Sequence, residues 1–86
     1  MIDHSEAYGD ALLADGFEGA LIGFGFHFNA AVAVYDYHLC LDILRKRDGM
    51  SADEAREFFE FNVVGAWMGQ NTPVFVTKIG ALMAWG

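Results

Sequence analysis

The sequence predicts an α+β domain, in which a small three-stranded, mainly antiparallel sheet packs against two central helices and a short N-terminal helix precedes the sheet. Aromatic and small residues alternate between positions 20 and 28, and an apolar run follows at 31–35, which is typical of a β-hairpin. Apolar residues at helical spacing and a capping motif occupy 36–66, and a third apolar run lies at 74–77. With 86 residues, the chain is expected to form a single domain over 1–86.

The N-terminal helix is expected over residues 5–15. Ser5 suits the N-cap, and Glu6 would lie where the positive helix end favours an anion. Gly9 weakens the interior of this helix, and Gly16 follows as a stop signal.

The hairpin is expected to pair two strands around a turn at Asn29-Ala30. Phe24, Phe26 and Phe28 recur with a period of two, which would place them on one face of the first strand. The residues of the opposite face would be Gly23, Gly25 and His27. The Gly-Phe-Gly stretch lacks the Lys-Ser/Thr of a phosphate-binding loop, so we interpret it as a strand bend.

Two helices are expected in the centre of the chain. The first begins after Asp36 as N-cap and runs to about Arg47. Its apolar side follows the spacing i, i+3, i+4, i+7 and consists of Tyr37, Cys40, Leu41 and Leu44. The second begins with the capping box Ser51 to Glu54. Its core face is expected to consist of Ala55, Phe58, Phe59, Asn62, Val63 and Ala66. The pattern does not decide between helix and strand for the apolar tail at 79–86.

The charge of the chain is −7 and is unevenly distributed. This net charge argues against direct binding of nucleic acid or of anionic membranes. Residues 1–18 contain no base and five acids, namely Asp3, Glu6, Asp10, Asp15 and Glu18. We predict that these acids, together with Trp85 in the tail, contact a partner protein.

A cytoplasmic location is expected, since the N-terminus lacks the basic residues of a secretory signal. The uncharged stretches 19–35 and 61–77 are interrupted by glycine and polar residues, so no membrane span is expected. The single Cys40 excludes an internal disulfide.

Catalytic and metal-binding patterns are not evident. His4, His27 and His38 do not have the spacing of metal ligands, and Cys40 lies on an apolar helix face, where a core residue is expected. We therefore predict no enzymatic activity, no cofactor and no metal.

One polar region is a candidate ligand site. Asn62 falls on an apolar helix stripe, where a buried amide needs partners, so we expect it to hold the loop 69–73 or a strand end. Loops collect binding residues, and this loop lies between two apolar elements. The predicted ligand-binding residues are Tyr35, Asp36, Asn62, Gln70, Asn71 and Thr72.

Residues 33–76 contain a recognisable set of short segments. They are Val34-Tyr35-Asp36-Tyr37, Arg47-Asp48-Gly49-Met50-Ser51, Glu54-Ala55, Glu60-Phe61-Asn62-Val63-Val64-Gly65-Ala66 and Asn71-Thr72-Pro73-Val74-Phe75. In these segments, about half of the chain resembles a family of small uncharacterised proteins encoded by tailed bacteriophages and prophages. The resemblance implies a phage-type setting in the cytoplasm of a bacterial host cell and implies no catalytic residues.

Three hypotheses of function follow. The first is a non-enzymatic inhibitor that binds a host or bacterial-defence protein, as anti-CRISPR proteins and nucleic-acid mimics do. The second is a small-molecule- or nucleotide-binding protein with a pocket near Asn62 and the loop 69–73. The third is a structural or assembly protein. In each case a homodimer is expected, because the apolar content exceeds what a thin domain buries.

Overall fold

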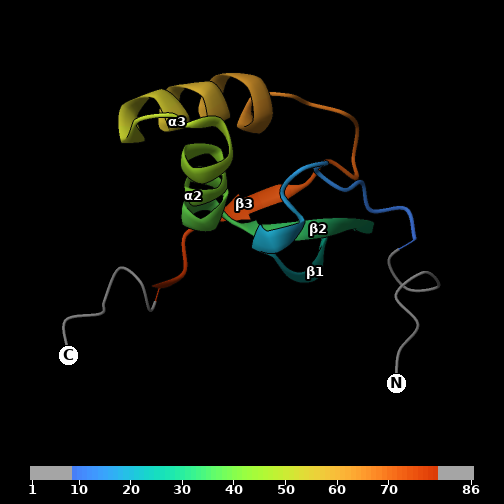
Figure 1. The fold of residues 1–86 in the computed structure, drawn as a ribbon. Coiled ribbons are helices and arrows are strands. Elements are labelled where there is room, and N and C mark those ends of the chain that lie inside the picture. Colours follow the sequence, from blue (N-terminus) through green and yellow to red (C-terminus); the bar gives the residue numbers. More distant parts are fainter. Residues whose placement is uncertain (1–8, 80–86) are drawn as a thin grey trace.

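The computed structural model describes residues 9–79, and residues 1–8 and 80–86 lie outside the described part (Figure 1). Its elements are η1 (Glu18–Ala20), β1 (Leu21–His27), β2 (Ala30–Asp36), α2 (Tyr37–Asp48), α3 (Ala52–Phe59), η2 (Glu60–Val64) and β3 (Val74–Val76). The strand order is β1-β2-β3, with β1 antiparallel and β3 parallel to β2. The two helices pack against each other, and α2 also contacts β2 and η1. The predicted α+β class is therefore confirmed.

Residues 9–15, the described part of the helix predicted over 5–15, do not form a helix. Residues 9–16 form turns and extended chain, and the short helical element of this region is the 3-10 turn η1. Two backbone N–H groups explain the difference, because they bond to distant parts of the fold. Leu12 N–H donates to Asn71 O at 3.2 Å, and Ala14 N–H donates to the Tyr35 hydroxyl at 2.7 Å. These groups are thereby drawn away from the local bonds of a helix.

The hairpin is confirmed, but its turn lies one residue earlier than predicted. His27 pairs with Ala30, so the connecting residues are Phe28 and Asn29. Phe28 has a φ of 58°, a conformation that a bulky side chain rarely adopts, and its side chain is 90% exposed. A register shift between Leu21 and Gly23 marks a bulge, as expected for a bent strand.

Capping of both central helices agrees with the sequence prediction. Asp36 Oδ1 accepts from Leu39 N–H at 3.0 Å, and Gly49 ends α2 in the left-handed conformation with a φ of 69°. Both bonds of the Ser51–Glu54 capping box are present at the start of α3. The helix then widens into the π-helical turn η2, in which Gly65 N–H donates to Glu60 O, five residues back, at 3.1 Å.

The core lies where α2, α3 and the sheet meet. Its largest fully buried side chains are Tyr35, Phe59, Leu44 and Cys40. The Phe59 ring meets Phe17 and Phe75 edge to face, with centroids 5.4 and 4.9 Å apart. Phe75 comes from β3 and Phe17 from the N-terminal segment, so Phe59 joins three parts of the chain.

No helix in residues 9–79 is long and apolar enough to cross a membrane. Of the predicted tail element at 79–86, only Ile79 belongs to the described residues. The candidate residues Asp3, Glu6 and Trp85 also lie outside the described residues.

Candidate functional site

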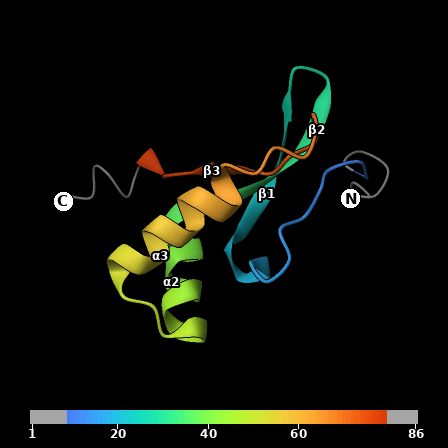
Figure 2. The same cartoon turned by 90° about the horizontal axis from the view of Figure 1, so that it is seen from above.

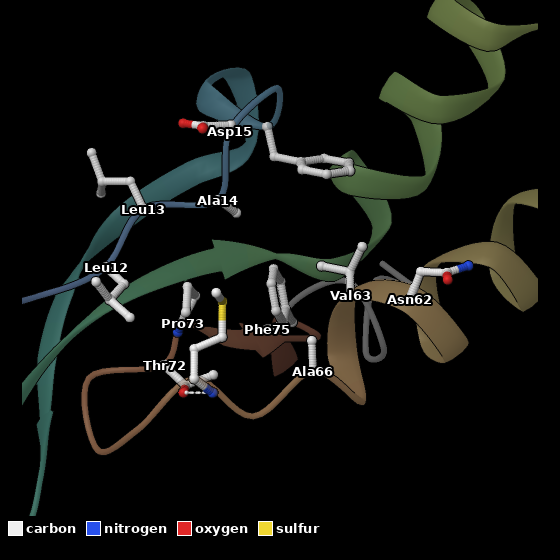
Figure 3. A pocket seen from close by; sticks show the side chains of 12 residues that line it. Leu12, Leu13, Ala14, Asp15, Asn62, Val63, Ala66, Thr72, Pro73 and Phe75 are labelled. Carbon is white, nitrogen blue, oxygen red and sulfur yellow. Dashed lines mark hydrogen bonds between the residues drawn. The ribbon is translucent and has the colours of Figure 1, made fainter.

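An open groove lies between the N-terminal segment, η2 and the loop that leads into β3 (Figure 3). It has a volume of about 280 Å³, and most of its lining is apolar. The residues that line this apolar groove are Leu12, Leu13, Ala14, Asp15, Phe17, Asn62, Val63, Ala66, Met68, Thr72, Pro73 and Phe75.

One wall of the groove is the N-terminal segment 12–17, which tertiary contacts hold in place. Besides the bonds of Leu12 and Ala14 described above, Arg47 Nη1 donates to Gly16 O at 3.0 Å. The same guanidinium lies 5.5 Å from the centre of the Phe17 ring, a cation–π contact. Gly16 has a φ of 89°, so glycine suits this bend.

The opposite wall is formed by η2 and the loop that follows it. Figure 2 shows this loop running along β2 toward the hairpin end before it turns back into β3. Thr72 closes the loop internally, since its hydroxyl accepts from Met68 N–H at 2.8 Å and donates to Gly69 O at 2.6 Å. Gly69 has a φ of 102°, which allows the reversal.

The expectation that Asn62 is a buried amide is wrong. Its side chain is exposed, and Nδ2 donates to Phe58 O at 3.1 Å on its own helical segment. Asn71 instead attaches the loop to the sheet, because its Nδ2 donates to Ala31 O at 2.8 Å. Asn62 lies one helical turn after Phe58, which is itself 40% exposed, whereas Val63 lies one turn after the buried Phe59 and packs against the core.

Tyr35 and Asp36 have structural partners in the fold. Tyr35 is 1% exposed, and its hydroxyl accepts from Ala14 N–H. Asp36 caps α2 and also lies 3.7 Å from Lys78 Nζ. Both polar groups are thus satisfied by the protein itself, which gives each residue a structural role beside the predicted ligand contact.

The six predicted ligand residues do not converge on one place. Asn62 and Thr72 line the apolar groove. Gln70 lies at the hairpin end, beside a separate hollow that it lines together with Phe28 and Trp67. Tyr35, Asp36 and Asn71 make the bonds within the fold that are given above.

Sequence reasoning missed the apolar residues of the groove mouth. Leu13 is 58% exposed and Met68 is 68% exposed, and the neighbouring Trp67 is 73% exposed. The only sequence signal was the surplus of large apolar residues, which did not indicate where they would gather.

Three of the predicted acidic residues are described, and all are exposed. Asp15 lines the groove, Asp10 precedes the segment 12–17, and Glu18 follows it as the first residue of η1. One Glu18 carboxylate oxygen accepts from Gly16 N–H at 3.0 Å, which ties this side chain to the turn.

Two buried side chains, Cys40 and Tyr35, have raised pKa values. Burial raises the pKa of the Cys40 thiol to about 12, with a further contribution from the negative charge of Asp36. Burial is also the main cause that raises the pKa of Tyr35, and the charges of Glu18 and Asp15 act in the same direction. Both groups are therefore protonated at neutral pH. No group of three or more metal-ligating side chains occurs in residues 9–79.

Comparison with protein-family models, with curated proteins and with solved structures yields no match for this chain. The resemblance to phage-encoded proteins therefore stays a prediction.

Proposed function

We propose that this chain is a non-enzymatic protein-binding module that receives a segment of its partner in the apolar groove. The observation that carries this proposal is the exposure of Leu13 and Met68 in the lining of the apolar groove, with the exposed Trp67 next to Met68 in the sequence. Large apolar side chains that face solvent together mark interaction sites. Tryptophan and methionine are also enriched in interfaces relative to other surfaces.

One feature of the groove favours a protein segment over a small molecule. The Asn62 amide nitrogen and the Thr72 hydroxyl, which could orient a small molecule, are engaged, because Asn62 bonds to Phe58 O and Thr72 bonds to its own loop.

The biological setting we propose is the one that the resemblance implies: a phage-type inhibitor of a host or bacterial-defence complex. An acidic chain can occupy a protein surface that otherwise takes nucleic acid, and the exposed Asp10, Asp15 and Glu18 support this role. In this proposal the chain mimics nucleic acid rather than binding it.

Site-specific photocrosslinking in bacterial lysate tests the proposal. A benzophenone side chain at Met68 or Leu13, at the groove mouth, should form an adduct with a nucleic-acid-handling protein, and added unlabelled chain should compete. The control position is Glu57, which is exposed on α3. No adduct at either groove position in low salt, or equal adducts at Glu57, would overturn the proposal.

A further inference from the structure

We infer that the apolar groove selects a cationic partner segment, with a bulky apolar side chain that enters the groove and a lysine or arginine that meets Asp15 at its rim. The inference rests on the proposed protein-binding function and specifies the chemistry of the partner.

The interior of the groove selects for an apolar group. Phe17 is buried and Val63 and Phe75 are partly buried, so they present carbon surfaces to whatever enters. Met68 stands beside them with most of its surface exposed, and the flexible methionine side chain adapts to occupants of different shape. A volume of about 280 Å³ suits one or two side chains.

The rim of the groove adds a negative charge. Asp15 is the charged residue of the lining, and no hydrogen bond or ion pair engages its carboxylate within the described residues. Asp10 and Glu18 are exposed on either side of the segment 12–17 in the sequence. Figure 3 shows the Asp15 carboxylate on the same side of the segment as Leu13, pointing away from Phe75 and Val63, so it would meet a part of the partner that lies outside the groove.

Arg47 reaches this segment, but its ion pair is with Asp48. Its guanidinium donates to Gly16 O and makes two bonds with its neighbour Asp48, at 3.1 and 3.2 Å. The charges of Asp15 and Glu18 still reach the Tyr35 hydroxyl, where they help to raise its pKa. Arg47 is also attracted to the charge of Glu18, whereas Asp15 has no cationic partner among the described residues.

Two labelled peptides test the inference by fluorescence anisotropy. Both have the same length and the same amphipathic leucine pattern, and the polar positions are lysine in one peptide and glutamate in the other. The lysine peptide should bind more tightly, and its affinity should fall as salt rises. Asp15→Asn should weaken its binding by about two- to fivefold, the range of exposed ion pairs.

Two further variants separate the rim charge and the groove from general effects. Asp42→Asn removes the same charge from an exposed position on α2, outside the groove, and should weaken the lysine peptide less than Asp15→Asn does. Ala66→Trp places a large ring in the groove and should weaken binding by about tenfold or more, with circular dichroism showing that the fold is kept.

The results of the peptide and crosslinking experiments test the charge preference of the groove separately from its protein-binding function. Equal affinity for the two peptides, or equal losses in Asp15→Asn and Asp42→Asn, would overturn the charge selection, while crosslinks at the groove mouth would still support protein binding. Unchanged binding in Ala66→Trp, or no binding of the lysine peptide, would overturn the groove as the site of a cationic segment.

Discussion

The hydroxyl of Tyr35 should be a main support of the N-terminal segment, and Tyr35→Phe tests this. The variant removes one oxygen and keeps the ring, which lies 5.5 Å from Phe75 and is 1% exposed. The lost bond is the one from Ala14 N–H, at 2.7 Å. Because the ring is buried, water cannot easily replace the hydroxyl, and the amide of Ala14 stays unpaired.

The expected cost follows from that unpaired amide. Leaving a buried donor without a partner costs about 1–3 kcal/mol. A domain of 86 residues is stable by about 4–13 kcal/mol, at about 0.05–0.15 kcal/mol per residue. With a urea m-value of about 1 kcal/mol/M, the unfolding midpoint should fall by about 1–3 M.

Urea unfolding followed by circular dichroism measures this change, and Tyr37→Phe is the matched control. Tyr37 also loses a hydrogen bond, the one its hydroxyl donates to Glu60 at 2.5 Å, but that bond is exposed to solvent. We expect it to cost less than 1 kcal/mol, about the net value of an exposed bond. A loss below about 0.5 kcal/mol in Tyr35→Phe, or a larger loss in Tyr37→Phe, would refute the reasoning.

The pH dependence provides a second measurement on the same variant. The pKa of Tyr35 is raised in the folded protein, mainly by burial, so the unfolded chain releases this proton more readily. Its contribution to stability is complete below pH 10 and declines as the pH rises through the folded pKa. The alkaline loss of stability should therefore be steeper in the wild type than in Tyr35→Phe.

Three further predictions concern other parts of the fold. Burial raises the pKa of the Cys40 thiol to about 12, so this thiol should react with a disulfide reagent at pH 8 only at the rate at which the protein unfolds. The stability of the fold should decline between pH 9 and 12. Rapid reaction of the native protein would contradict the burial of Cys40. Ser51→Ala should cost about 1 kcal/mol in thermal or urea unfolding, because the capping box with Glu54 is lost; an unchanged midpoint would show that this cap is dispensable. Asn71→Ala should cost about 1–2 kcal/mol and speed amide exchange in the loop, because the bond to Ala31 O is lost; unchanged exchange would refute its attaching role.

Local chemistry made the central helices predictable from sequence. Asp36 caps α2 and Ser51 with Glu54 caps α3, and each motif acts over only three residues. Gly49 ends α2 for the same local reason, its left-handed backbone. Such signals need no knowledge of the rest of the fold.

Tertiary bonds decided the parts that the sequence did not predict. The N-terminal segment has helix-compatible residues, yet Ala14 donates to Tyr35, 21 positions away. Asn62 and Asn71 are chemically identical, and only the path of the chain places Asn71 beside Ala31 and Asn62 on the surface. The candidate groove was missed for the same reason, since its walls come from distant segments.

Stability and binding are coupled in this architecture, because the contacts that hold the N-terminal segment also build one wall of the groove. The Tyr35 hydroxyl holds Ala14, next to Asp15 at the rim. Tyr35→Phe should therefore loosen the rim and weaken the lysine peptide while most of the protein is still folded. Ser51→Ala destabilises α3 at the end opposite η2 and should leave peptide affinity unchanged. If the two variants weakened the peptide equally at matched stability, the groove would depend on global stability alone and not on the bond from Ala14.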